Sequence, residues 1–237
     1  VAHPMALGSG AADRGGGAVH LVILGTATVN GQILADAVGP NTMSDGASGG
    51  SIYLFCDSLS GTGVLSACGA TGYHCGGGGR IAVVLNNSDS FGNVAMRTFG
   101  ATHYLNPQFH SAAGTIYLET RQAGVPVLQK VVMDNNNIST PDYILTEFPP
   151  FLEEEPPDWR AIRLRVLRAA RAGMTVPDLR IGDLEWVDAS ARLHLLGKTL
   201  YVRSIYHPFT DGAESTVVVK DGGEIIWSRP GTVIVVR

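Results

Sequence analysis

A short glycine-anchored segment recurs four times in the first half of the chain, and this repeat constrains the fold more than any other feature. The four copies read GGAVHL, GGSIYL, GGRIAV and AGTIYL, starting at residues 16, 49, 78 and 113. Their anchor residues Val19, Ile52, Ile81 and Ile116 are 33, 29 and 35 positions apart. Such an irregular period is typical of a repeated unit whose loops vary in length while its strands stay constant.

Each copy is followed by a second apolar segment and then by a glycine-rich loop. The second segments span residues 31–35, 63–67 and 92–96, and the loops span 39–50, 69–79 and 100–114. Two short strands and a loop in roughly 30 residues form one rung of a solenoid, which must stack on its neighbours to bury its apolar face. The predicted fold class is therefore all-β, a parallel β-helix (β-solenoid) with irregular rungs of about 30 residues, followed by further β rungs or a small β region.

Stacking of the rungs predicts that the four anchor residues form one inward column. Within the second copy, the alternation of apolar residues predicts that Ile52 and Leu54 face inward while Tyr53 faces out. Glycine makes up 30 of the 237 residues. We expect it where the backbone takes a positive φ or where adjacent rungs approach closely.

The glycine-rich run resembles a known repeat type. Residues 15–39 read GGGAVHLVILGTATVNGQILADAVG, and GGSIYLFC and GGGGRIAVV follow in the next copies. This pattern is similar to the glycine-rich parallel β-helix repeats of large bacterial cell-surface proteins, well over residues 15–135 and more loosely over 180–237. The resemblance implies a β-helix fold and a location at the cell surface, and it brings no catalytic residues.

Three regions follow from the pattern. Residues 1–147 form the glycine-rich rungs, residues 148–180 hold a loop rich in Pro and Glu and an Arg-rich segment, and residues 181–237 form C-terminal β rungs. Residues 159–172 fit two structures. Asp158 as an N-cap predicts a helix, whereas the alternation of Ile162, Leu164 and Val166 with arginines favours a strand.

The three cysteines, Cys56, Cys68 and Cys75, lie within twenty residues of one another. An odd number allows at most one internal bridge. Two interpretations stay open, namely one disulfide with one buried thiol, or three buried thiols. In an extracellular chain we expect at least one oxidised pair.

The edge formed by the stacked loops is the best candidate for a site. Six side chains with polar or reactive groups lie in these loops: Asp45, His74, Cys75, His103, Tyr104 and His110. Histidine and cysteine bind soft or borderline metals, and a Cys with a His can form a nucleophile pair. Their spacing matches no ligand motif, and polar loop residues are common on such an edge. We therefore list them as binding candidates and assign no catalytic residue, metal or cofactor.

Charge and composition exclude several classes of function. The formal net charge of −4 gives no basic field of the kind that attracts nucleic acid. No apolar stretch approaches 18 residues, so membrane insertion is not expected. Glycoside hydrolysis requires a pair of carboxyl groups, and the acidic residues of the first 115 positions are isolated from one another.

The sequence therefore predicts a non-enzymatic protein, an extracellular structural or adhesin-type β-solenoid that is part of a surface or a filament. Its expected partners are copies of itself or adjoining segments of a longer chain, since the chain begins in mid-pattern, with polysaccharide as a further partner. The alternative is a carbohydrate-active β-helix enzyme (lyase or glycosidase) or a carbohydrate-binding module.

Overall fold

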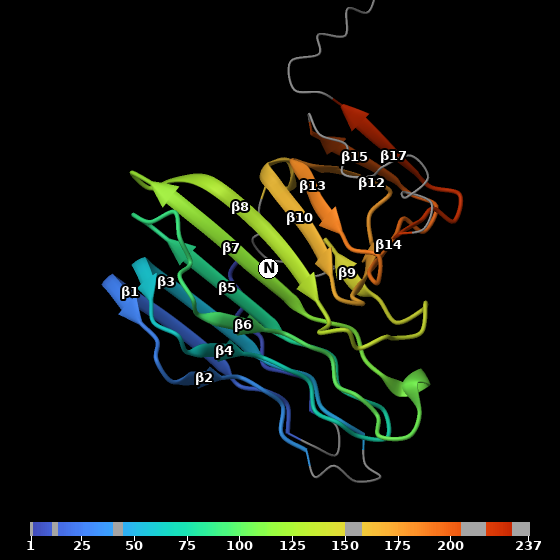
Figure 1. Cartoon of the computed structure of the whole chain (residues 1–237), viewed down its shortest axis with the longest axis horizontal. Helices are drawn as coiled ribbons and strands as arrows, with labels where there is room; N and C mark the ends of the chain where they lie inside the picture. The colour runs from blue at the N-terminus through green and yellow to red at the C-terminus, as the bar shows by residue number, and fades with distance from the viewer. Residues whose placement is uncertain (1, 11–13, 40–44, 150–157, 205–216, 229–237) are drawn as a thin grey trace, which may run out of the picture.

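The computed structural model describes residues 2–10, 14–39, 45–149, 158–204 and 217–228, and these are nearly all β. The first half of the chain contributes two parallel sheets, drawn from blue to green in Figure 1. One contains β1 (Ala18–Thr28), β3 (Ser51–Ser60), β5 (Arg80–Leu85) and β7 (Thr115–Gln122). The other contains β2 (Gln32–Leu34), β4 (Val64–Ser66) and β6 (Ala95–Arg97). We call β1 with β2 the first rung, β3 with β4 the second, β5 with β6 the third, and β7 the fourth.

The predicted inward column is confirmed by the strand register. Val19 pairs with Ile52, Ile52 with Ile81, and Ile81 with Ile116, in parallel at every step. These side chains belong to a hydrophobic core between the two sheets, together with Leu54 on the same face. Sequence alternation thus placed the inner face of each strand correctly.

Tyr53 faces away from Ile52 and Leu54, as predicted, but it is not exposed to solvent. Tyr53 does lie on the face opposite Ile52, but that face is also buried, in a second core with Ala82, Val84 and Tyr117. The rings of His3 and His20 stack on Tyr53 at centroid distances of 5.0 and 4.7 Å. The N-terminal segment therefore covers part of the sheet that period-two alternation assigns to solvent.

The strand direction reverses after the fourth rung. β8 (Val125–Asp134) pairs antiparallel with β7. The two-residue turn between them, Ala123 and Gly124, has φ values of 49° and 78°, as a tight hairpin turn with two positive φ angles requires. Ala-Gly is a weak hairpin signal in a sequence, and we did not predict this reversal.

The second half of the chain extends the large sheet and adds two further parallel sheets. β8 continues in parallel into β10 (Ile162–Leu167) and β13 (Asp183–Val187), so that one seven-stranded sheet joins both halves (Figure 1). A second sheet contains β9 (Thr146–Phe148), β11 (Arg171–Met174), β14 (Arg192–His194) and β16 (Val218–Val219). A third contains β12 (Asp178–Ile181), β15 (Thr199–Arg203) and β17 (Glu224–Ser228). The two short 3₁₀ helices are η1 (Pro107–Phe109) and η2 (Trp159–Ala161).

The strand alternative for residues 159–172 is confirmed. Ile162, Leu164 and Val166 are fully buried on one face of β10. Asp158 does act as an N-cap, but only of the single 3₁₀ turn η2. Its side chain accepts a hydrogen bond from the Arg160 N–H. Residues 150–157, which hold most of the predicted Pro/Glu-rich loop, lie outside the described residues.

Glycine allows the rungs to touch through their backbones. Gly50, Gly79 and Gly114 each precede a strand, and each N–H donates to a carbonyl at the end of the previous rung, at 2.6–2.8 Å. A Cβ on Gly79 would lie 2.1 Å from the carbonyl oxygen of Gly50, and one on Gly114 would lie 1.8 Å from that of Gly79. None of these glycines has a positive φ. The close approach of backbones, and not an unusual backbone conformation, excludes side chains here.

We predict that Gly79→Ala destabilises the protein by about 3 kcal/mol, because the new methyl group must push two stacked backbones apart. Gly17→Ala is the matched control. Gly17 holds the same place before β1, but a Cβ there meets nothing within 4 Å. Urea unfolding of both variants measures the difference, and equal midpoints would contradict the steric role of the glycine column.

Candidate functional site

The long loops of successive rungs run side by side, as the sequence predicted. Gly46 donates to the carbonyl of His74 at 2.8 Å, Gly49 to that of Gly77 at 3.0 Å, and Gly78 to that of Ala112 at 3.0 Å. These bonds align the loops into one stacked edge, at the lower right of Figure 1. Side chains that are far apart in the sequence therefore meet at the loop tips.

Two of the predicted residues form a polar pair at this edge. The Asp45 Oδ1 and His74 Nδ1 atoms lie 2.7 Å apart, and both side chains are exposed. The His74 ring also meets the Tyr73 and Phe109 rings edge to face, at centroid distances of 4.9 and 5.3 Å. The pair thus lies against an aromatic group that sequence reasoning missed.

His103 and Tyr104 join the same group from the next loop. The His103 ring stacks on Tyr104 at 4.7 Å and meets Phe109 at 5.3 Å. Its Nδ1 accepts hydrogen bonds from the N–H groups of Leu105 and Asn106, at 3.1 and 2.9 Å. His103 is therefore a buried, structurally held ring, whereas Tyr104 is exposed. We call Asp45, Tyr73, His74, His103, Tyr104 and Phe109 the loop-tip cluster.

The other two predicted residues, Cys75 and His110, do not form a reactive thiol–imidazole pair in the structure. The Cys75 thiol lies 3.6 Å from the carbonyl oxygen of Gly72, and burial raises the pKa of this thiol, which disfavours the thiolate. The Nδ1 atom of His110 contacts the carbonyl oxygen of Ser139, at 2.9 Å. Among the residues that the structure describes, no three His, Cys, Asp or Glu side chains are grouped to hold a metal ion.

All three cysteines are free thiols, so the disulfide interpretation is not realised. Cys56 lies in the core between the two sheets, and Cys68 accepts a hydrogen bond from the Phe99 N–H of the next rung. Cys75 lies near the loop tips, and the three side chains thus occupy separate parts of the second rung and the loop that follows it. Burial raises the pKa of each thiol. The free thiols give no support to the expectation of an oxidising compartment.

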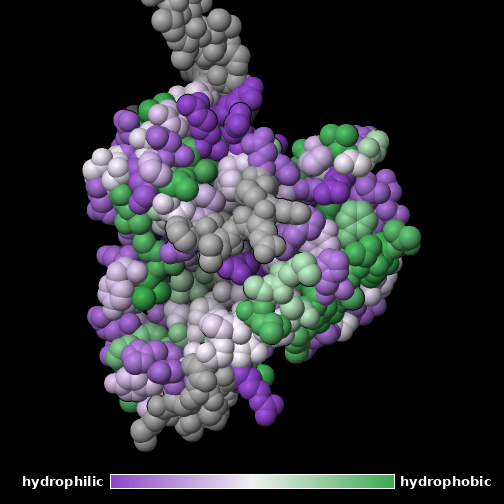
Figure 2. Space-filling view, turned by 180° about the vertical axis from the view of Figure 1, so that it is seen from behind, coloured by the Kyte–Doolittle hydropathy of each residue, from purple (hydrophilic) through white to green (hydrophobic). Residues whose placement is uncertain are grey.

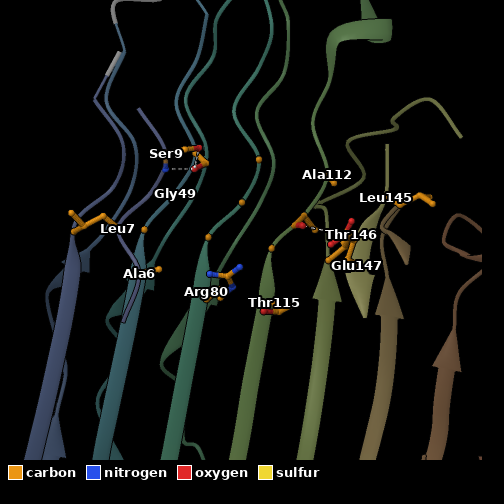
Figure 3. Close-up of a pocket in the computed structure, with 17 residues that line it drawn as sticks. Ala6, Leu7, Ser9, Gly49, Arg80, Ala112, Thr115, Leu145, Thr146 and Glu147 are labelled. Atoms are coloured by element: carbon orange, nitrogen blue, oxygen red, sulfur yellow. Dashed lines mark hydrogen bonds between the residues drawn. The ribbon is translucent and has the colours of Figure 1, made fainter. Parts of the chain in front are cut away.

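A groove that we did not predict crosses the rungs beside the starts of β3, β5 and β7. Its volume is about 640 Å³. Figure 3 shows Ala6, Leu7 and Ser9 of the N-terminal segment on one side and Leu145, Thr146 and Glu147 on the other. Glycines of the stacked loops form much of its lining, and Arg80 and Thr115 lie between the two walls. The signal that could have revealed it is the run of small residues before each strand.

A buried polar network lies on the same face of the sheet. The carboxylate of Glu119 accepts hydrogen bonds from Tyr117, from the Nε of Arg121 and, at 3.0 Å, from Gln129. Burial, followed by the contact with Glu119, raises the pKa of Tyr117 well above its usual range. Burial by itself raises the pKa of Glu119, but these three donors outweigh it, and the pKa is lowered below the ordinary value.

Comparison of the chain with protein-family models, with curated proteins and with solved structures finds no match. The described residues include no helix with the length and apolar character that a bilayer crossing requires.

We predict that the Glu119 network makes the protein sensitive to acid. Because the folded-state pKa is lowered, this contribution is complete above the unfolded glutamate pKa of about 4.3 and is lost as pH falls through the folded value. Glu119→Gln should lower the free energy of unfolding by about 2 kcal/mol at neutral pH. Below a pH of about 4.3, the variant should lose less stability on further acidification than the wild type does. Glu147→Gln, at an exposed side chain, is the control and should leave the pH profile of thermal unfolding unchanged.

Proposed function

We propose that the stacked rungs are parallel β-helices and that the protein is a non-catalytic, extracellular scaffold of the structural or adhesin type. Support comes from the in-register column of anchor residues and from the glycine contacts that join successive backbones. Both features lock each rung to the next along the whole stack. Such a body is rigid and presents its loops at regular spacing.

The observation that carries the proposal is the open edge at β1. Among the described residues, β1 pairs with β3 alone, over an 11-residue strand without a charged side chain. Val22 and Leu24 are 58% and 91% exposed, and Leu34 and Val38 of the same rung are also exposed. Figure 2 shows hydrophobic residues gathered on the side of the molecule where β1 lies. An edge of this kind is a template for the addition of a further strand.

The occupant we propose is β1 of a second copy, paired antiparallel. The chain already contains such a joint, because β7 and β8 pair antiparallel within one continuous sheet. A two-fold axis perpendicular to the sheet would bring the regular segment 18–23 against itself and keep both cores on the same side. The absence of charge on β1 leaves no like-charge repulsion across this axis. The irregularity between Ile23 and Thr26 limits the pairing to this segment.

We predict that the chain forms dimers through β1 and that the double variant Val22→Lys, Leu24→Lys is monomeric, because each copy would then carry one lysine within the paired segment and one directly after it. The double variant Val125→Lys, Val127→Lys is the control, since these valines are 64% and 65% exposed on β8, away from that edge. Sedimentation velocity over a range of concentrations measures the mass of each protein. A wild-type chain that stays monomeric throughout, or a control variant that also dissociates, would contradict the edge joint.

A second candidate function is polysaccharide binding at the loop-tip cluster. Tyr104 stacks on His103 and is 66% exposed, Tyr73 exposes nearly half of its surface, and the Asp45–His74 pair adds exposed polar groups to the same cluster. Exposed aromatic rings next to polar groups suit the apolar faces and hydroxyls of sugars.

For this candidate we predict saturable binding of at least one polysaccharide in a broad panel, weakened about tenfold by Tyr104→Ala, since stacking on one ring is worth about 1 kcal/mol or more. Tyr143→Ala is the control, because Tyr143 is equally exposed but lies outside the cluster. Equal affinity of both variants for the polysaccharide would contradict binding at the loop-tip cluster. Release of new sugar ends during the assay would contradict a non-catalytic protein.

A further inference from the structure

We propose that the groove beside the starts of β5 and β7 binds an extended peptide segment of another protein, built from small residues such as Ala, Gly and Ser. The proposal is independent of the scaffold function. It rests on the way in which the chain's own N-terminal segment binds to the second rung. The groove is the continuation of that binding track over the third and fourth rungs.

The N-terminal segment lies along the start of the second rung through backbone contacts. The carbonyl of Ser9 accepts a hydrogen bond from the Ser48 N–H at 3.0 Å, and the Ser9 N–H donates to the Ser48 hydroxyl at 2.7 Å. Ser51, three residues after Ser48, donates a hydrogen bond from its hydroxyl to the carbonyl of Ala6, three residues before Ser9. The second rung thus holds a peptide by donating hydrogen bonds to its carbonyl groups.

The third and fourth rungs have backbone N–H groups at the positions equivalent to Ser48, and these N–H groups have no acceptor among the described residues. Ser51 pairs with Arg80, and Arg80 pairs with Thr115. Counting back three positions, the equivalents of Ser48 are therefore Gly77 and Ala112, which both line the groove. The N–H groups of Gly77 and Ala112 donate to no other group in the described part of the chain.

Arg80 extends the pattern with a stronger donor. It stands where Ser51 stands in the second rung, and its exposed guanidinium has no hydrogen-bond or ion-pair partner among the described residues. Figure 3 shows this side chain between the two walls of the groove. A peptide in the groove would therefore present carbonyl oxygens to Gly77 and Ala112 and a carbonyl or carboxylate to Arg80.

The groove is wide enough for one extended peptide chain. Between the N-terminal segment and the wall at Leu145 and Glu147 lie two rungs, which at about 4.8 Å each leave about 10 Å. Much of the lining is glycine and alanine, which lets a second backbone approach as closely as the N-terminal segment does. Residues 6–9 of that segment read ALGS and contact the second rung through Ala6 and Ser9. Main-chain recognition by unpaired N–H groups is an established mode of peptide binding.

The test uses a peptide with the sequence of residues 2–10, AHPMALGSG, labelled at its C-terminus, and fluorescence anisotropy with the whole chain. We expect saturable binding. Gly77→Pro removes one N–H donor and should abolish binding, whereas Gly77→Ala keeps the donor, and its methyl group meets only one atom, 3.7 Å away. Arg80→Ala should weaken binding about tenfold, as expected for loss of a hydrogen bond from a charged group.

Thermal unfolding verifies that each variant is folded. If Gly77→Pro unfolds, Arg80→Ala against the wild type decides the question. A peptide with Trp in place of its Ala and Gly residues should not bind, because the lining leaves no room for large side chains. Absence of binding by the wild type, equal affinity in Arg80→Ala, or equal binding of the Trp peptide would overturn the proposal. Displacement of the peptide by a polysaccharide but not by unlabelled peptide would overturn it as well.

Discussion

Direct contact between the backbones of stacked rungs is the interaction on which the rest of the structure depends. Gly50, Gly79 and Gly114 lie so close to the preceding rung that a single methyl group would overlap a carbonyl oxygen. The same residues donate hydrogen bonds to the end of the previous rung. This contact fixes the height and register of each strand, and it holds the long loops in one stack. Side chains can then pack in columns, because the backbone has already set their spacing.

The part of the large sheet formed by β3, β5 and β7 is mostly buried on both faces. The inner face packs against the short strands β2, β4 and β6, and the outer face carries Tyr53, Tyr117 and the Glu119 network. The reversal at Ala123 and Gly124 joins a second set of parallel strands to the same sheet. Because the outer face is buried there, the charged carboxylate of Glu119 needs the three hydrogen-bond donors that surround it. The groove lies beside the N-terminal segment, whose residues Ala6, Leu7 and Ser9 form one of its walls.

The loop-tip cluster and the groove show two ways in which stacking creates a site. At the loop tips, register brings Asp45 to His74 and places Tyr73, Phe109 and His103 around them. In the groove, register repeats one donor geometry over successive rungs, and among the described residues only the second rung has its acceptor. The first site depends on side chains and could be anticipated in part from the loops. The second depends on N–H groups, which every residue except proline carries, so the small residues before each strand are its one indirect mark in the sequence.

The sequence by itself determined the all-β class, the parallel pairing of β1, β3, β5 and β7, and the alignment of Val19, Ile52, Ile81 and Ile116, because these follow from local alternation and from the positions of glycine. It also favoured the strand at Ile162, for the same reason. Tertiary structure alone decided the antiparallel reversal at β8, the burial of Tyr53, the free state of the cysteines and the existence of the groove. Each of these depends on which distant segment covers a given face, and a pattern of period two describes a strand without describing what lies against it.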